Sequence, residues 1–306
     1  MIQPLVKIGK RRDKDPTKTR AIRERFIREV EVRFNEVILA VQKKLVDENY
    51  LQPIPEKEEN APLFVMAARK YTYEQAPAKI DSFGDWLDQL VKDKVLSTYR
   101  AGGLVGYGHV NWTDVFIQSA YQQGIADARA DLASAGAQLP DMGPVYAAMN
   151  RPFHADRAAL LYIRAFNDMK GVTEAMKSQM SHELALGMAE GRSPYDIAYK
   201  LRDRVEKIGI TRGRLIARTE VVRAHNQAAL NEYDALEGIV GEEIKVQWWT
   251  ALDERVRSTH QARHSKVYKR ETAMGLIGEP NCRCALLPWT KTLADARVGR
   301  LERKNK

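Results

Sequence analysis

The sequence is poor in cysteine, with only Cys282 and Cys284 among 306 residues. One residue apart, they are poorly placed to bridge each other, which excludes a disulfide scaffold and predicts a reducing compartment. Long apolar runs are also missing, since no stretch approaches the roughly 18 uninterrupted apolar residues of a membrane span. The first residues, MIQPLVKIGKRRDKDPTK, contain no apolar segment of a secretory signal. We therefore expect a soluble protein without a membrane partner.

Basic charge is concentrated at the two ends of the chain. The net charge is +9: residues 1–30 carry +6, residues 288–306 carry +4 and the rest of the chain carries −1. Such ends are typical of arms that meet a polyanion or an acidic protein face, although simple solvated tails have the same composition. The first interpretation predicts weak, sequence-independent contacts with the phosphates of double-stranded DNA. The candidate DNA-binding residues are Lys10, Arg11, Arg12, Lys14, Lys18 and Arg20.

Apolar residues at helical spacing predict several helices. A stripe that begins near Thr17 or Thr19 recurs every three or four residues from Ile22 to Leu45, and the prolines within 51–62 end it. Caps, glycines and the same spacing predict the remaining helices. They are expected from Asp81 to Val95, from Thr113 to Ala135, over 155–169 and 172–189, over 191–205 with Ser193 as the cap, and from Arg214 to Leu236 with a stop near Gly238.

After Gly241 the pattern changes to short strands. Segments 243–252, 266–270 and 283–289 are rich in β-branched and aromatic residues. The predicted fold class is α+β, with a mainly α-helical body and a small C-terminal α+β unit. We predict a basic N-terminal arm at 1–20, helical regions at 21–140 and 145–240, the α+β unit at 241–290 and a basic tail at 291–306.

Possible metal ligands gather in the C-terminal unit. A helix over 254–264 would place His260 and His264 on one face, and Cys282 and Cys284 would share one face of a strand. These four side chains could bind a structural zinc ion, although CxC is a less usual spacing than CxxC. The alternative is a metal-free cluster, in which His260 bonds to Asp253 or to the backbone and the thiols pack as apolar groups. The sequence therefore makes no cofactor certain.

Motifs for catalysis are incomplete. The histidine pair lacks the glutamate that the HExxH pattern of metalloproteases requires, and no serine lies in a GxSxG turn. Nothing in the sequence places a histidine beside the thiols. We therefore predict that the protein is not an enzyme. On the helix of 214–236, Glu220 could pair with Arg223 or with Arg212.

The chain resembles the phage Mu F-like minor head protein family in three ordered segments. They are IARTEVVRAHNQAALNEYDAL (216–236), VQWWTALDERVRSTH (246–260) and EPNCRCALLPW (279–289), and GMAEGRSPYDIAYKLRDRV (187–205) fits the family's helical lead-in. The polar signature that this resemblance implies falls on Arg218, Thr219, Glu220, Asp253, Arg255, His260, Cys282 and Cys284. Many members carry Asp-Gly shortly after the histidine, where this chain has Gln261 to Ser265.

The resemblance implies a minor structural protein of the head of a tailed phage or prophage. Such proteins associate with the portal or major capsid protein during head morphogenesis and accompany packaged DNA. The implied locations are the host cytoplasm during assembly and the interior of the virion head. Two alternatives from other classes stay open. One is a zinc-dependent hydrolase, nuclease or toxin-like enzyme built on the Asp/His/Cys cluster, and the other is a nonspecific DNA-binding module.

The small size of the C-terminal unit suggests what holds it together. About 60 residues bury little apolar surface, so such a unit needs a metal or a dense polar network. We expect Asp253, Arg255, His260, Cys282 and Cys284 to come together in space for this reason. Because side chains alternate along a strand, one of Trp248 and Trp249 should enter the core while the other faces the domain boundary.

Overall fold

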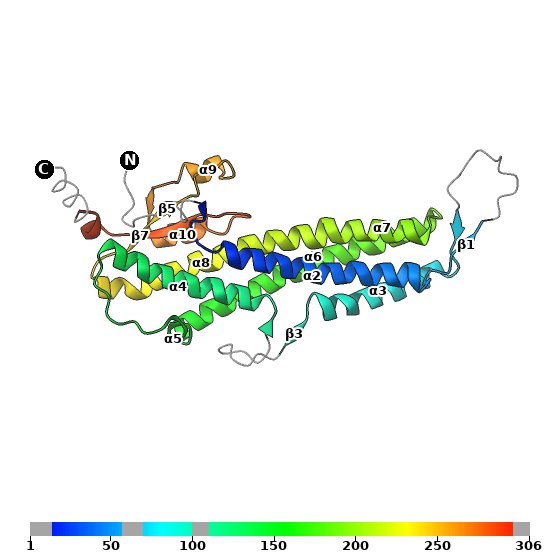
Figure 1. Ribbon diagram of the computed structural model, residues 1–306, viewed down its shortest axis with the longest axis horizontal. Helices are drawn as coiled ribbons and strands as arrows, with labels where there is room; N and C mark the ends of the chain where they lie inside the picture. The colour runs from blue at the N-terminus through cyan, green and yellow to red at the C-terminus, as the bar shows by residue number, and fades with distance from the viewer. Residues whose placement is uncertain (1–13, 57–69, 100–109, 296–306) are drawn as a thin grey trace. The chain divides into compact units, whose positions relative to one another are not determined.

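The computed structural model describes residues 14–56, 70–99 and 110–295 of the chain. Helices dominate, and the larger antiparallel sheet lies in the C-terminal part (Figure 1). The predicted fold class, a mainly α-helical body with a small C-terminal α+β unit, is confirmed. Within the described ranges, no helix is long and apolar enough to cross a membrane.

Two compact units are assembled from alternating stretches of the chain. Unit 1 comprises the described residues within 1–26, 99–166 and 215–306, and unit 2 comprises those within 27–98 and 167–214. Three helices contribute residues to both units: α2 (Arg20–Gln42), α6 (Pro152–Ala189) and α8 (Thr211–Val240). The linear domain boundaries derived from the sequence stay a prediction.

The first predicted helix is confirmed as α2. Its stripe from Phe26 to Leu45 is buried, and a π-helical turn at Lys43–Asp47 continues it toward the strand β1 (Ile54–Pro55). The strand β2 (Tyr71–Thr72) pairs with β1, and α3 (Ala76–Lys94) follows. The expected cap at Asp81 is wrong, because α3 begins five residues earlier. Proline suits the first turn of a helix, where its missing N–H has no partner to lose, and APAKI supplies one there.

The segments 155–169 and 172–189, expected as separate helices, form the single helix α6. Gly171 lies inside it and does not interrupt the helix. The helix α7 (Pro194–Arg204) begins as predicted, with the Ser193 side chain accepting a hydrogen bond from the Asp196 amide. A π-helical turn at Val205–Ile210 joins α7 directly to α8. The expected stop of α8 near Gly238 is wrong, since Gly241 in the left-handed region (φ +78°) follows its last residue.

In unit 1, α4 (Asp114–Ala135) packs closely on α8. It begins after Thr113 and ends at Gly136, as predicted, and α5 (Val145–Met149) follows the loop. The short strands β3 (Thr98–Tyr99) and β4 (Val110–Asn111) precede α4. A buried contact joins the two helices, because Asp127 of α4 lies 3.1 Å from His225 Nε2 of α8. Asp127 also lies 2.6 Å from Nζ of Lys18, which precedes α2. A methyl group at Gly124 would lie 2.7 Å from Ala228 Cβ, so the helices approach closely there.

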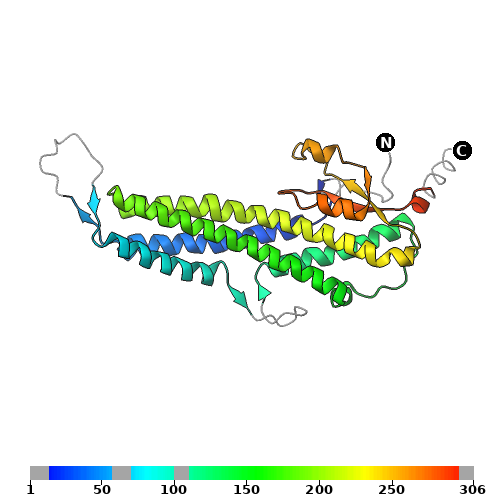
Figure 2. The same ribbon diagram turned by 180° about the vertical axis from the view of Figure 1, so that it is seen from behind.

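The three predicted C-terminal strands are confirmed. β5 (Lys245–Trp249) lies between β6 (Val267–Tyr268) and β7 (Ala285–Trp289), all antiparallel, with Gln247 opposite Leu287. The sheet contributes to a core that also includes Leu132 of α4 and Tyr233 of α8. Figure 2 shows α8, in yellow, running beside the strands of the sheet. The helices α9 (Ser258–Gln261) and α10 (Arg270–Leu276) connect the strands. Trp248 and Trp249 are both buried.

Candidate metal centre

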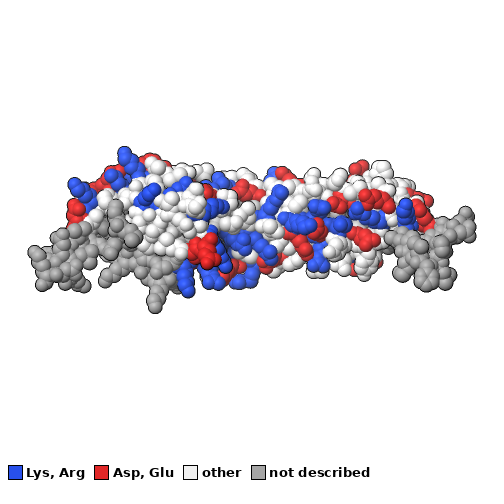
Figure 3. Space-filling view, turned by 90° about the horizontal axis from the view of Figure 1, so that it is seen from above, with Lys and Arg blue, Asp and Glu red and all other residues white. Residues whose placement is uncertain are grey.

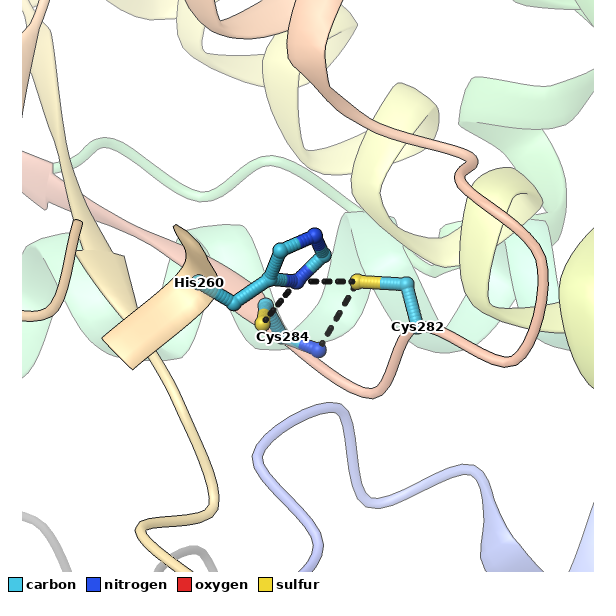
Figure 4. Close-up of side chains that lie close together, drawn as sticks. All are labelled: His260, Cys282 and Cys284. Atoms are coloured by element: carbon cyan, nitrogen blue, oxygen red, sulfur yellow. Dashed lines mark hydrogen bonds between the residues drawn. The ribbon is translucent and has the colours of Figure 1, made fainter. Parts of the chain in front are cut away.

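Three side chains that can bind a metal converge in unit 1. His260 comes from α9, while Cys282 and Cys284 come from the loop that leads into β7 (Figure 4). His260 Nδ1 lies 3.3 Å from Cys284 Sγ and 3.6 Å from Cys282 Sγ. All three residues are buried, and their ligand atoms lie within 4.8 Å of one another. We call these three residues the HCC cluster.

The neighbours of His260 fix the direction of its ring. Its Nε2 lies 2.9 Å from a carboxylate oxygen of Glu279, and the ring of Trp248 meets it edge to face at 5.8 Å. An ionised carboxylate only accepts hydrogen bonds, so the proton of a neutral His260 belongs on Nε2. The Nδ1 lone pair then faces the two sulfurs.

The contacts within the HCC cluster shift its pKa values. A hydrogen bond with the Cys284 side chain lowers the pKa of Cys282 to about 5, and its bond with His260 acts in the same direction against burial. The bond between the thiols, together with burial, raises the pKa of Cys284. The pKa of His260 is raised, chiefly by its bond with Cys282 and further by Glu279, while burial opposes the shift. One of the two thiols therefore gives up its proton readily.

A pocket of about 250 Å³ adjoins the HCC cluster. The cluster forms part of its wall, together with arginines that provide positive charge: Arg255, Arg257 and Arg283. Asp253 holds Arg283 through two hydrogen bonds of 2.8 and 2.5 Å. This pair lowers the pKa of Asp253 and raises that of Arg283. Asp253 therefore positions a wall of the pocket, and it does not contact His260 as the metal-free alternative proposed.

One face of α8 holds the loop that carries the cysteines. Thr219 Oγ1 accepts a hydrogen bond of 3.1 Å from the Asn281 amide, and Arg223 donates one of 2.7 Å to the Gly278 carbonyl. The Asn226 side chain donates to the Cys284 carbonyl at 2.8 Å and accepts from the Leu286 amide at 3.1 Å. The first strand residues and the turn before them are thereby fixed to the helix.

Other residues of the implied signature lie around this helix face. Glu220 is buried and lies 3.3 Å from Arg223, as one of the two predicted pairings has it, and 3.1 Å from Arg164. Arg218 is exposed on α8. Arg255 is exposed at the rim of the pocket, and its backbone amide bonds to Asp253.

The structure does not bring His264 to the HCC cluster. Residues 254–264 contain only the four-residue helix α9, so the two histidines do not share a helix face. The Nδ1 of His264 instead lies 3.0 Å from the Thr250 hydroxyl, and its ring packs on Trp249 at 4.3 Å. Burial lowers the pKa of His264. Its role in the unit is therefore packing against the end of β5.

Sequence reasoning missed Glu279 and Asn226. Nothing in the local pattern around Glu279 marks it as the partner of His260, because the two residues meet only after the chain has folded. Asn226 did carry a signal: Thr219, Arg223 and Asn226 are spaced i, i+4 and i+7 and therefore share one helix face. The implied signature contains Thr219 but not Asn226.

The candidate DNA-binding residues fall partly outside the described ranges, which begin at Lys14. Lys10, Arg11 and Arg12 lie outside them. Lys14 is exposed, whereas Lys18 pairs with buried Asp127 and Arg20 lies 2.6 Å from Glu24. On the face drawn in Figure 3, basic and acidic side chains of the described residues are interspersed.

Comparison with known proteins bears on the part of the chain that holds the HCC cluster. Residues 178–287 match the family described as Phage Mu protein F like protein. The predicted resemblance to Mu F-like proteins is confirmed. The matched residues form about a third of the chain and include α7, α8, β5 and the HCC cluster. The Mu F-like family suggests a phage head morphogenesis protein with a structural role. No curated protein and no solved structure matches the chain.

Proposed function

We propose that this Mu F-like protein is a minor head protein of a tailed phage or prophage, which associates with the portal or the inner capsid surface during head morphogenesis. The observation that carries the proposal is the family match over 178–287. The matched stretch contains Thr219, Asn226 and the HCC cluster, which together attach the C-terminal sheet to α8. These contacts support a unit built to keep its shape within an assembly. The protein would be present in the host cytoplasm during assembly and in the head interior afterwards.

Co-expression tests the association. The chain is produced with the portal and major capsid proteins encoded beside its gene, and assembled particles are separated by sedimentation. We expect the chain to sediment with particles, and to stay in the light fractions when both partners are omitted. Omitting the portal or the capsid protein singly identifies which of them binds it. Absence from particles in every combination would contradict the proposal.

We further propose that the protein contacts packaged DNA without sequence preference. Support comes from the basic charge of residues 1–30, from the exposure of Lys14 and from the phosphate chemistry of lysine and arginine. Lys18 contributes little to such contacts, because its ammonium group already pairs with Asp127 at 2.6 Å. The contacts would therefore depend on residues 1–14.

Salt titration tests the DNA contact. Each neutralised phosphate contributes a slope of roughly −0.9 to the plot of log affinity against log salt concentration. Deleting residues 1–14 should flatten this slope, whereas deleting residues 296–306 measures the contribution of the other basic end. Equal slopes for the full chain and both deletions, or no binding at low salt, would show that the ends do not bind DNA.

A further inference from the structure

The two thiols of the HCC cluster are directed at a single acceptor. His260 Nδ1 lies within 3.6 Å of both sulfurs, while its Nε2 faces Glu279. Nδ1 carries one lone pair, so it cannot accept a full hydrogen bond from each thiol. A cation placed among the three atoms would instead receive a lone pair from each of them. The arrangement thus fits a metal ion, which would use all three donor atoms at once.

The two nitrogen–sulfur distances match a tetrahedral zinc site. With Zn–N bonds of about 2.1 Å and Zn–S bonds of about 2.3 Å, the nitrogen of such a site lies roughly 3.6 Å from each sulfur. The observed Nδ1–Sγ distances are 3.3 and 3.6 Å. Two sulfur ligands and an imidazole also suit zinc better than calcium or magnesium, which prefer oxygen.

The surroundings resemble the supporting contacts of metal ligands. Glu279 faces the outer nitrogen of His260, as carboxylates do behind metal-bound histidines. The Cys284 amide lies 3.4 Å from Cys282 Sγ and donates to it, which stabilises negative charge on that sulfur. Arg255 of the adjoining pocket adds positive charge near the thiolates, whereas Arg257 and Arg283 are paired with Glu279 and Asp253.

We propose that His260 Nδ1, Cys282 Sγ and Cys284 Sγ bind one zinc ion, whose fourth coordination position opens into the adjoining pocket. The two thiols release their protons to solvent as the thiolates bind, so the site changes from Zn²⁺ with two thiols to a neutral complex. The ion joins α9 to the loop before β7 and thereby links the two connections of the C-terminal sheet. A water molecule or a partner's side chain can complete the coordination. This proposal does not depend on the head-protein function.

Metal content is the first test. The full chain is purified with a reductant, equilibrated with zinc chloride and desalted. Its zinc content is then measured by inductively coupled plasma mass spectrometry. We expect one zinc per chain, and less than a tenth of that in Cys282→Ser, Cys284→Ser and His260→Gln. His264→Gln is the matched control, because His264 lies in the same unit outside the HCC cluster and should leave the zinc content unchanged.

Cobalt substitution tests the ligands without relying on the variants' folding. Co²⁺ added to the metal-free full chain should give thiolate charge-transfer absorption and the intense d–d bands of a tetrahedral site, saturating at one equivalent and reversed by Zn²⁺. The proposal would be overturned if these bands were absent from wild-type chain whose thiols are both reduced and whose circular dichroism is native. Zinc retained by Cys282→Ser and Cys284→Ser, or a Cys282–Cys284 disulfide that persists in reductant, would also overturn it.

Discussion

Thr219 Oγ1 accepts a hydrogen bond of 3.1 Å from the backbone amide of Asn281, the residue immediately before Cys282. Asn281 has a positive φ of 57°, so the chain turns sharply at this point. The contact joins the first implied signature segment on α8 to the last one before β7. The direction in which Cys282 leaves the turn therefore depends on a hydroxyl group 62 residues before Asn281.

Replacing Thr219 with valine should lower the free energy of unfolding by about 1 kcal/mol, because the Asn281 amide loses its acceptor while the side-chain volume is kept. Urea unfolding followed by tryptophan fluorescence, to which Trp248 and Trp249 contribute, measures the change. Thr219→Ser retains the hydroxyl and is the control, with a smaller expected loss. Equal losses in the two variants would mean that packing matters here and the hydrogen bond does not.

Asn226→Ala should be more damaging, by about 3 kcal/mol, because it leaves the Cys284 carbonyl and the Leu286 amide without their partner. Asn226 is 2% exposed, so water cannot easily replace the amide. The neighbouring Gln227 is half-buried and bonds only to Asn231 among the contacts recorded for its side chain. Gln227→Ala should therefore cost less than about 1 kcal/mol in the same urea experiment. A loss in Asn226→Ala no larger than this would contradict the bridging role.

Two glycine substitutions should have opposite effects on stability. In Gly124→Ala the new methyl group would contact the His225 backbone and Ala228, so α4 and α8 would be forced apart at a cost of about 2 kcal/mol or more. Gly171 is exposed within α6 and has nothing within 4 Å of the position of a methyl group. Gly171→Ala should raise the stability by about 0.5–1 kcal/mol through helix propensity. Thermal unfolding of both variants beside the wild type shows whether each substitution lowers or raises the stability.

Acid should remove the contribution of Asp127 to the free energy of unfolding. Burial raises the pKa of this carboxyl, but hydrogen bonds with His225 and Lys18 and their charges outweigh burial and lower it to about 2 from an ordinary 3.8. The folded state thus binds the proton less readily than the unfolded chain. The stabilisation is complete above about pH 4 and is lost as the pH falls through 2, by about 2 kcal/mol.

Urea unfolding at intervals between pH 5 and pH 2 measures this loss. Asp127→Asn has no carboxyl to protonate, so its stability should be lower at pH 5 and fall less steeply toward pH 2. Parallel curves for the variant and the wild type would show that other carboxyl groups account for the acid sensitivity.

Local patterns predicted most of the fold. The stripe from Phe26 to Leu45 and the cap at Ser193 depend only on neighbours in the sequence, and both are present. The errors concern helix ends and continuity. At residues 155–189, packing of an apolar face outweighs the low helix propensity of Gly171, and two expected helices become one.

The sequence predicted the residue types of the candidate site but not which residues lie beside them. The cysteines and His260 stand out as metal ligands in the sequence, whereas the choice of His260 over His264 depends on how long the helix around them is. Residue spacing does not show that the helix ends at Gln261, before His264. Glu279 is recognisable only from its distance to His260 in the folded chain.

The core beneath the C-terminal sheet sets a limit on what the family-matched stretch can do alone. Ala128 and Leu132 of α4 belong to the same buried cluster as Leu230, Val246 and Trp248, yet α4 lies outside residues 178–287. A fragment cut at the ends of the match would expose the apolar surface that α4 covers. The Mu F-like stretch is thus a region of similarity and not a separable folding unit. A new N-terminal half joined to it in evolution or by engineering has to supply an equivalent helix.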